Sequence, residues 1–395
     1  MSPTRHRLTD SRVKGSRRTG LAELPLHGGR APPWLFARMV LLAREILGHL
    51  VAEHGSDEVL RRLADPFWFQ ALGCVLGFDW HSSGVTTTTC GALKEAVRGR
   101  EADFGFYVAG GKGAVSRRTP AEITATCDAL SHEPETLVGA SRLAAKVDNT
   151  ALQDGHQLYH HTFVFTPSGR WCVVQQGMSD TARTARRYHW LSETLKNFVD
   201  EPHAAICCDR HGASLNMVAA ESAAARAAVT ELAAQPPETV LSLFDRVPTL
   251  FMPARHPVSL ADVDPRQLQK VLLKTYERAP ERFETVLATE GLGPKALRAL
   301  VLTAELIYGT KASARDPARF AFTHGGKDGT PYPVDRATYD GTIEVLRDAL
   351  GRARKIDRSE RIRALKRLAA FTCAPATQAG RTARTGGAPR STYTP

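Results

Sequence analysis

The chain has 395 residues, of which 43% are hydrophobic and 24% are charged. This composition is typical of folded protein, and the length predicts two or three domains of ordinary size. No apolar run reaches the roughly 18 residues that a membrane-spanning helix needs, so no contact with a membrane is expected. The formal net charge of +11 suits a polyanion such as nucleic acid as a partner, but basic tails on a neutral protein explain it equally well.

Both ends of the chain are basic and poor in apolar residues. Residues 1–19 and 373–395 are therefore expected to be disordered tails, and the first lacks the apolar stretch of a signal peptide. The protein is expected to be cytoplasmic and nucleoid-associated. Its seven cysteines include no Cys-x-x-Cys pair, so buried reduced thiols are expected rather than disulfides or a zinc ribbon.

Residues 20–235 predict an α+β domain. Apolar residues recur at threes and fours over 31–64, and another helix is expected from about residue 86 to 97. A short strand in "ADFGFYVAGG" leads through "KGAVSRRTPAEI" into a helix, which Thr119 and Glu122 are expected to begin as a capping box.

The next part of this domain predicts a β-hairpin, because two β-rich runs flank "TPSG" at residues 166–169. The following segment, "TARTARRYHWLSETLKNFV", predicts an amphipathic helix with Arg186 and Arg187 exposed and Trp190 buried. An alanine-rich helix is expected over residues 221–235.

The rest of the chain predicts a proline-rich linker (236–262) and then helices only. The expected fold class is an α+β N-terminal domain followed by an all-α C-terminal domain (263–372) containing a helix-hairpin-helix. The C-terminal helices are expected at 265–280, 282–289, 293–308, 336–355 and 358–371.

The segment "FETVLATEGLGPKALRALVLTAELIYG" predicts two helices joined by a Gly-Leu-Gly turn. In a helix-hairpin-helix such glycines let backbone N–H groups face a DNA phosphate, with support from the helix dipole. Gly291, Gly293 and Lys295 are therefore candidate DNA-binding residues, and their contacts would not depend on base sequence. An ordinary corner between helices, with glycine as C-cap, is the alternative.

This segment resembles the helix-hairpin-helix base-excision DNA glycosylases, and among them the archaeal 8-oxoguanine glycosylases. In lyase-active members a lysine after the hairpin attacks the sugar, assisted by an aspartate that often lies in Pro-x-Pro-Val-Asp. The resemblance implies that Lys295 is the nucleophile and that Asp335, in "PYPVDR", is its partner. It implies a DNA-repair enzyme, a lesion-directed N-glycosylase and AP lyase, that rotates its target base out of the duplex.

Motifs along most of the chain resemble a second family, the uncharacterised bacterial and archaeal domain of unknown function 763. They include "LPLHGGRAPPWL", "DPFWFQALGCVLGFDWHSSG", "AKVDNTALQDGHQLYHH" and "HGGKDGTPYPVDR". This resemblance spans about residues 19–371. The family carries no known activity, so the resemblance implies no mechanism.

Polar side chains concentrate in "AKVDNTALQDGHQLYHH". Asp148, Asp154 and one histidine are candidate ligands for Mg²⁺ or Mn²⁺ in a metal-dependent nuclease. Neighbouring histidines in a strand face opposite sides, so only one can join a given site. A metal-free hydrogen-bonded network is the alternative, and the hairpin lacks the lysine of a restriction-nuclease signature. The candidate nuclease residues are Lys146, Asp148, Asp154, His160, His161 and Gln175.

Further basic residues extend the DNA-binding hypothesis. Lys112 and Arg117 lie in a glycine-rich loop whose amides are suited to a phosphate, although no Walker-type GK[ST] occurs. Lys327 follows "HGG", and Arg187 lies in "RRYHW", which mixes cations with aromatic rings as single-strand binders do. Three functions therefore stay open: a glycosylase and lyase, a metal-dependent nuclease, or a DNA-binding protein without enzymatic activity.

Overall fold

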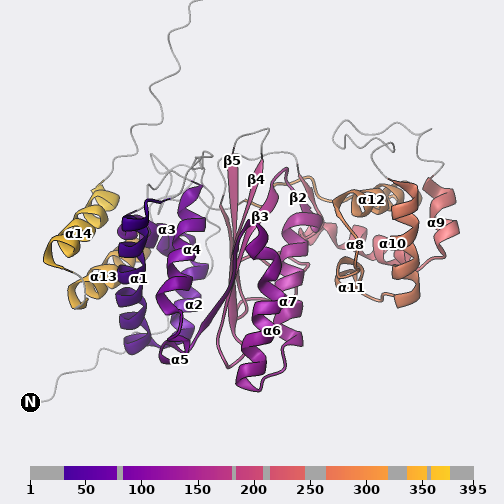
Figure 1. Cartoon of the computed structure of the whole chain (residues 1–395). Coiled ribbons are helices and arrows are strands. Elements are labelled where there is room, and N and C mark those ends of the chain that lie inside the picture. The colour runs from indigo at the N-terminus through magenta and orange to yellow at the C-terminus, as the bar shows by residue number, and fades with distance from the viewer. Residues whose placement is uncertain are drawn as a thin grey trace, which may run out of the picture.

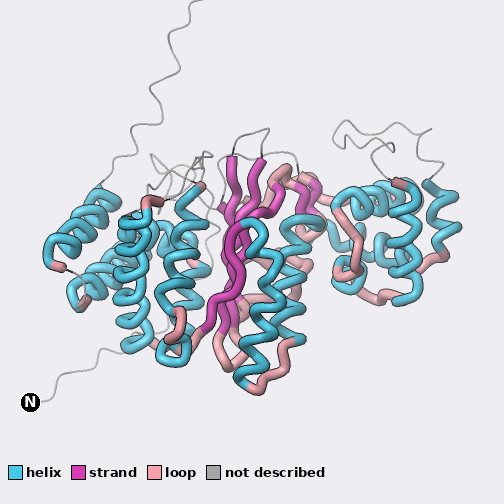
Figure 2. The backbone as a smooth tube through the Cα atoms, in the orientation of Figure 1, coloured by secondary structure: helices cyan, strands magenta, loops and turns pink. Residues whose placement is uncertain are grey.

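A five-stranded antiparallel sheet forms the centre of the protein, with strand order β1-β3-β4-β5-β6. Helices cover both of its faces (Figures 1 and 2). Within the described residues, no helix combines the length and apolarity that a bilayer span requires. The structure is a computed structural model, and it describes residues 31–77, 83–179, 184–207, 214–244, 264–318, 336–353 and 357–373.

The expected β-hairpin is confirmed as β3 and β4, and the short strand before it as β1. Gly169 has φ +79° in the connecting turn, a conformation that favours glycine. A second, two-stranded sheet pairs β2 with β7. The strands are β1 (Tyr107–Lys112), β2 (Leu152–Gln153), β3 (Gln157–Phe165), β4 (Trp171–Ser179), β5 (Thr184–Leu191), β6 (Ala205–Cys207) and β7 (Leu215–Asn216).

Strand β5 replaces the amphipathic helix that the sequence predicts, so that prediction is wrong. It pairs with β4 from Thr184 to Leu191. Arg186 and Arg187 are buried rather than exposed, whereas Trp190 is buried as expected. Because helices cover both faces of the sheet, this strand has no exposed side and lacks the alternating pattern of a half-exposed strand. Its two neighbouring arginines instead give the sequence the pattern of an amphipathic helix with a polar face.

One face of the sheet is covered by N-terminal helices, which share a hydrophobic core with Val164 and Val174. Asp65 caps α3 by accepting a 2.8 Å hydrogen bond from the Phe67 N–H. These helices are α1 (Pro33–His54), α2 (Ser56–Ala64), α3 (Pro66–Leu76), α4 (Gly84–Val97) and the short α5 (Glu101–Phe104).

The other face is covered by α6 and α7, which pack on Phe163 and Tyr188. The expected capping box at α6 is wrong. The Thr119 hydroxyl donates to the Ser116 carbonyl, and the Glu122 carboxylate accepts from the Gly110 N–H and from Lys94. The elements of this layer are η1 (Gly113–Arg118), α6 (Thr119–Leu130), α7 (Glu135–Lys146) and η2 (Val147–Ala151).

The C-terminal helices divide into two groups on opposite sides of the sheet (Figure 1). Helices α10 to α12 pack beside α8 in the core of α6 and α7, whereas α13 and α14 pack against α1 and α3. This arrangement differs from the single all-α domain expected over 263–372. The helices are η3 (Ala220–Ser222), α8 (Ala223–Ala233), α9 (Pro237–Phe244), α10 (Pro265–Arg278), α11 (Phe283–Leu287), α12 (Pro294–Tyr308), α13 (Arg336–Arg352) and α14 (Arg358–Cys373).

Candidate nucleic-acid interface

The glycine turn, residues 288–293, joins α11 to α12. The Leu292 N–H donates to the Thr289 carbonyl at 3.2 Å, which closes a β-turn with Gly291 at its third position. Gly291 has φ +86°, so the turn itself requires glycine there. Gly293 has φ −108°, and a Cβ added to it meets no atom within 4 Å. Neither the backbone nor the packing of this structure therefore requires glycine at position 293.

Lys295 is the second residue of α12, and its side chain is exposed. The buried face of the same helix, which includes Leu297 and Leu300, fixes the helix in the core. The neighbouring Glu290 carboxylate lies 2.9 Å from Lys274 Nζ, and this hydrogen bond holds the pKa of Glu290 below its usual range. The partner cation partly offsets the repulsion that Glu290 exerts on an anion at the turn.

Side chains from the corner between α7 and β2 donate hydrogen bonds to carbonyls of the glycine turn and of Pro294. We call the side of the turn that faces this corner its inner side. Lys146 Nζ donates to the Leu292 carbonyl at 2.5 Å and lies 3.5 Å from the Thr289 carbonyl. Burial lowers the pKa of Lys146. Gln153 Nε2 donates to the Pro294 carbonyl at 2.9 Å. Lys146, expected at a nuclease site, thus contacts the glycine turn.

Four strands carry one row of polar side chains across the sheet. In register, Lys112 is paired with His160, His160 with Gln176, and Gln176 with Arg187. We call the end of the sheet at this row its polar end. The η2 segment lies there too, because its Asn149 side chain accepts a 3.3 Å hydrogen bond from the Leu158 N–H of β3. The glycine turn, held by Lys146 directly before η2, is therefore near the polar end.

The loop after β1 adds exposed cations at the polar end. Lys112, Arg117 and Arg118 are all exposed in or next to η1. Lys112 Nζ lies 5.9 Å from the centre of the Tyr159 ring. The structure therefore places the candidates Lys112 and Arg117 at the polar end of the sheet, near which the glycine turn also lies.

Asp148 is fully buried within a hydrogen-bonded network on the α7 face of the sheet. Its carboxylate accepts from Trp190 Nε1 at 2.9 Å and also from Gln175 Nε2 and His203 Nε2. The same glutamine lies 2.6 Å from His161 Nδ1 through its Oε1. Donors from the protein thus surround Asp148, as in the metal-free network that the sequence left open.

Asp154 belongs to a second network. Its carboxylate accepts from Arg186 Nη1 at 2.8 Å and from the Tyr188 hydroxyl at 2.7 Å. Burial raises the pKa of Asp154, but Arg186, His156 and Tyr188 outweigh it and lower the pKa to about 2. Among the described residues, no three His, Cys, Asp or Glu side chains gather as metal ligands. The structure thus offers no support for the magnesium or manganese site expected at Asp148 and Asp154.

His160 and Arg187 occupy the opposite sheet face from His161, as expected for neighbours in a strand. His160 Nε2 lies 3.0 Å from the Thr162 hydroxyl, and burial lowers the pKa of this histidine to about 3. Arg187 Nη1 donates to Gln70 Oε1 at 3.1 Å. Arg187 is fully buried, so the expectation that it contacts DNA at the surface is wrong.

The expected partners of Lys295 are not brought to it by the described part of the chain. Asp335 and Lys327 lie outside the described residues. Arg336, which follows Asp335, begins α13, and α13 packs against α1 on the opposite side of the sheet from α12 (Figure 1). The structure therefore gives the pairing of Lys295 with Asp335 no support.

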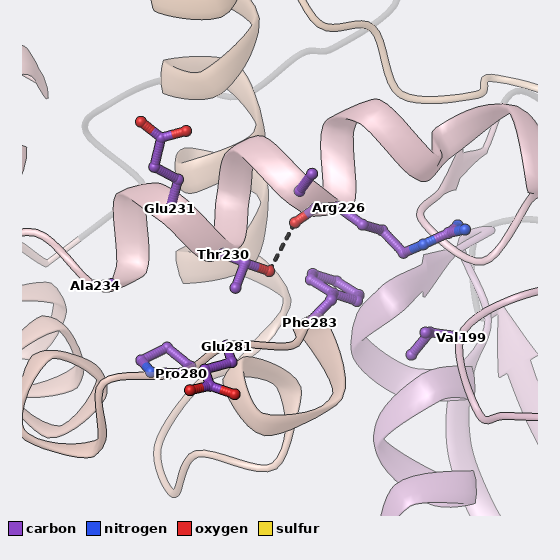
Figure 3. A pocket seen from close by; sticks show the side chains of 9 residues that line it. Val199, Arg226, Thr230, Glu231, Ala234, Pro280, Glu281 and Phe283 are labelled. Carbon is purple, nitrogen blue, oxygen red and sulfur yellow. Dashed lines mark hydrogen bonds between the residues drawn. The ribbon is translucent and has the colours of Figure 1, made fainter.

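A surface groove of about 460 Å³ lies between α8 and the connection from α10 to α11 (Figure 3). Phe283, Val199 and Pro280 contribute apolar walls. Arg226 also lines it, but its guanidinium donates to the carbonyls of Met217 and Ala219, which the structure places at 2.9 and 2.7 Å. None of the residues expected to bind DNA or metal lines this groove.

Several residues of these networks carry no recognisable sequence signal. His203 and Gln70 contact Asp148 and Arg187 from positions 55 and 117 residues away in the chain. Asp316 binds Arg186 Nη2 at 2.7 Å across 130 residues. Only the three-dimensional fold brings such partners together.

A family described as "Protein of unknown function (DUF763)" matches residues 20–334, which is well over half of the chain. No curated protein and no solved structure matches this chain. The resemblance to domain of unknown function 763 is thus confirmed, and the chain belongs to the DUF763 family.

Proposed function

We propose that this protein binds DNA through the phosphate backbone, with the glycine turn as a principal contact. The observation that carries the proposal is Gly293, where open space adjoins the start of the 15-residue helix α12. A glycine that neither conformation nor packing requires permits a ligand to approach the backbone closely. Exposed Lys295 supplies a cation in the same helical turn.

A phosphate fits this position for two physical reasons. The first N–H groups of a helix have no acceptor within the helix, and the helix dipole favours negative charge there. The ammonium of Lys295 adds a charge contact without reading base identity. Lys112 and Arg117, at the polar end of the sheet, supply further phosphate contacts in this proposal, and the net charge of +11 supports it.

The experiment measures the affinity for a fluorescent DNA duplex as a function of salt concentration. Lys295→Ala is compared with Lys311→Ala, which removes an exposed lysine beyond the other end of α12. We expect Lys295→Ala to weaken binding and to reduce the slope of log K against log salt by about 1, with Lys311→Ala close to wild type. Absence of DNA binding by the wild type at low salt contradicts the proposal.

Catalysis by Lys295 is not part of this proposal. An amine nucleophile needs burial or a partner that favours its neutral form. Lys295 is exposed, and the assisting residue expected from the glycosylase resemblance precedes α13 rather than α12. The contacts of the described residues thus support backbone binding better than lesion cleavage or metal-dependent cleavage.

A further inference from the structure

We propose that Lys146 is a positioning residue for DNA binding, because it fixes the direction in which the N–H of Gly293 points. The consequence for DNA rests on the proposed function, whereas the effect on the glycine turn does not. Lys146 lies in α7, in the layer that covers the sheet, and the glycine turn lies between α11 and α12. The two are 146 residues apart in the chain at the contact with Leu292.

The argument starts from the peptide unit between Leu292 and Gly293. A trans peptide is planar, and its C=O and N–H point in opposite directions. The carbonyl of Leu292 points at Lys146 Nζ, 2.5 Å away. The N–H of Gly293 therefore points away from Lys146. An added Cβ at Gly293 would meet no atom within 4 Å, so the packing leaves room beside this residue.

The ammonium holds this orientation more firmly than a neutral donor can. A hydrogen bond with a charged donor is about twice as strong as a neutral one, and partial burial strengthens it. Lys146 Nζ also lies 3.5 Å from the Thr289 carbonyl, the acceptor that closes the β-turn. One side chain therefore binds carbonyls at both ends of that turn. The Lys146 side chain lies on the inner side of the glycine turn. It is therefore not placed to contact a phosphate that binds on the opposite, outer side.

A second anchor holds the start of α12. Gln153 Nε2 donates to the Pro294 carbonyl at 2.9 Å, and Gln153 Oε1 accepts from Arg298 Nε at 2.7 Å. Gly293 thus lies between one anchored carbonyl before it and one after it. Lys146 ends α7 and Gln153 ends β2, so both anchors come from the corner between these two elements. In this proposal the corner supports DNA binding without touching DNA.

Hydrogen–deuterium exchange of residues 288–296 in the free protein tests the positioning role directly. The variant Lys146→Met keeps the length of the side chain and loses the ammonium. Its matched control is Lys94→Met, because Lys94 is also partly buried and donates to a carbonyl, that of Gly110 at 2.9 Å. We expect exchange in this segment to rise about tenfold in Lys146→Met and to stay at the wild-type rate in Lys94→Met.

DNA binding by the same variants separates positioning from contact. Lys146→Met is expected to weaken duplex binding about tenfold with an unchanged salt slope, because no phosphate contact is lost, whereas Lys295→Ala reduces the slope by about 1. Lys146→Arg, which keeps a cation, is expected to restore part of the affinity. A reduced slope in Lys146→Met overturns the proposal, since it shows direct contact with phosphate.

The two proposals fail in different ways. Unchanged exchange in a folded Lys146→Met protein overturns the positioning role, whatever the DNA result. If exchange rises in Lys146→Met but the wild-type protein does not bind DNA, the positioning role is supported and the proposed function is contradicted. If Lys146→Met does not fold, Gln153→Leu removes the second anchor, and its exchange over 288–296 is expected to rise in the same way.

Discussion

Arg186 and Asp154 form an ion pair inside the protein, with 2.8 Å between Nη1 and Oδ2 and only 1% of each side chain exposed. The second Nη of Arg186 lies 2.7 Å from Asp316 Oδ2. Because Asp316 follows α12, this pair of contacts fastens the end of the C-terminal helices α10–α12 to strand β5. The fold therefore depends on charges that water does not reach.

Asp154→Asn is expected to destabilise the protein by about 3–5 kcal/mol at neutral pH, because it leaves a buried arginine with one carboxylate fewer. The pKa of Asp154 is about 2 when folded, against 3.8 ordinarily. Stability from this group is therefore complete above about pH 4 and is lost as the pH falls toward 2. Urea unfolding of the wild type and of Asp154→Asn, at pH values from 7 down to about 2, measures this loss of stability.

The exposed pair of Arg170 and Asp57 provides the control for Asp154→Asn. Arg170 Nη1 lies 2.9 Å from Asp57 Oδ2, but 47% of the arginine side chain and 37% of the aspartate side chain are exposed. Water screens such pairs, so Arg170→Met is expected to cost less than about 1 kcal/mol. Similar losses in both variants would contradict the special role given to the buried pair.

Sequence patterns predicted the elements whose signals are local. The turn at residues 166–169 lies between two β-rich runs, and the helices α10 to α14 show the spacing of amphipathic helices, so both were predicted close to their observed positions. Strand β5 was missed because Arg186 and Arg187 are buried, and burial of arginine is rare enough that charge indicates a surface. Partners such as Asp154 and Gln70 make that burial tolerable, and they lie 32 and 117 residues away in the chain.

The sequence predicts that the residues of the proposed DNA contact lie together, but not which residues surround them. Gly291, Gly293 and Lys295 lie together, as their spacing predicts, at the start of one helix. The contact of Lys146 with Leu292 was not predictable, since it joins segments 146 residues apart. Position in the chain also predicts that α13 and α14 share a domain with α12. In the structure their apolar faces pack instead in the core of α1 to α4, which are distant in the chain.

The two glycines of the turn are expected to respond differently to alanine. Gly291→Ala forces a side chain into φ +86°, which costs about 1–2 kcal/mol of stability. Gly293→Ala is expected to leave the unfolding midpoint unchanged, since its φ is ordinary and the space is open. The added methyl keeps a phosphate away from the N–H, so DNA binding should weaken about tenfold, a loss of about 1.4 kcal/mol.

Gly139→Ala is the control for the two turn variants, because Gly139 lies within α7 and a Cβ there also meets no atom within 4 Å. It is expected to bind DNA as the wild type does. Equal DNA affinity of Gly293→Ala and Gly139→Ala would show that no ligand approaches the turn at Gly293.

The loop after β1 is expected to add a second set of phosphate contacts. Lys112 and Arg117 are exposed, so the double variant Lys112→Ala/Arg117→Ala should fold normally. The slope of log K against log salt should then fall by about 2, because each lost phosphate contact contributes about 0.9. An unchanged slope would restrict DNA binding to the glycine turn, and Lys311→Ala, beyond the far end of α12, again serves as the surface control.

Acid sensitivity of folding is expected to depend on His160. Burial holds its pKa at about 3 in the folded protein, whereas an unfolded chain has the ordinary value of 6.5. Between these values the unfolded state binds a proton that the folded state excludes, so stability falls as the pH drops from about 6.5 toward 3. The full effect is on the order of 5 kcal/mol.

His160→Gln is expected to flatten this pH dependence, because glutamine binds no proton in either state. His132→Gln, at an exposed position, is the control and should follow the wild-type curve. Free energies of unfolding at about pH 7, 5.5 and 4 measure the slopes. His161 is also buried with a lowered pKa, so some acid sensitivity is expected to remain in His160→Gln. Equal slopes in His160→Gln and wild type would mean that the His160 ring gains a proton without loss of the fold.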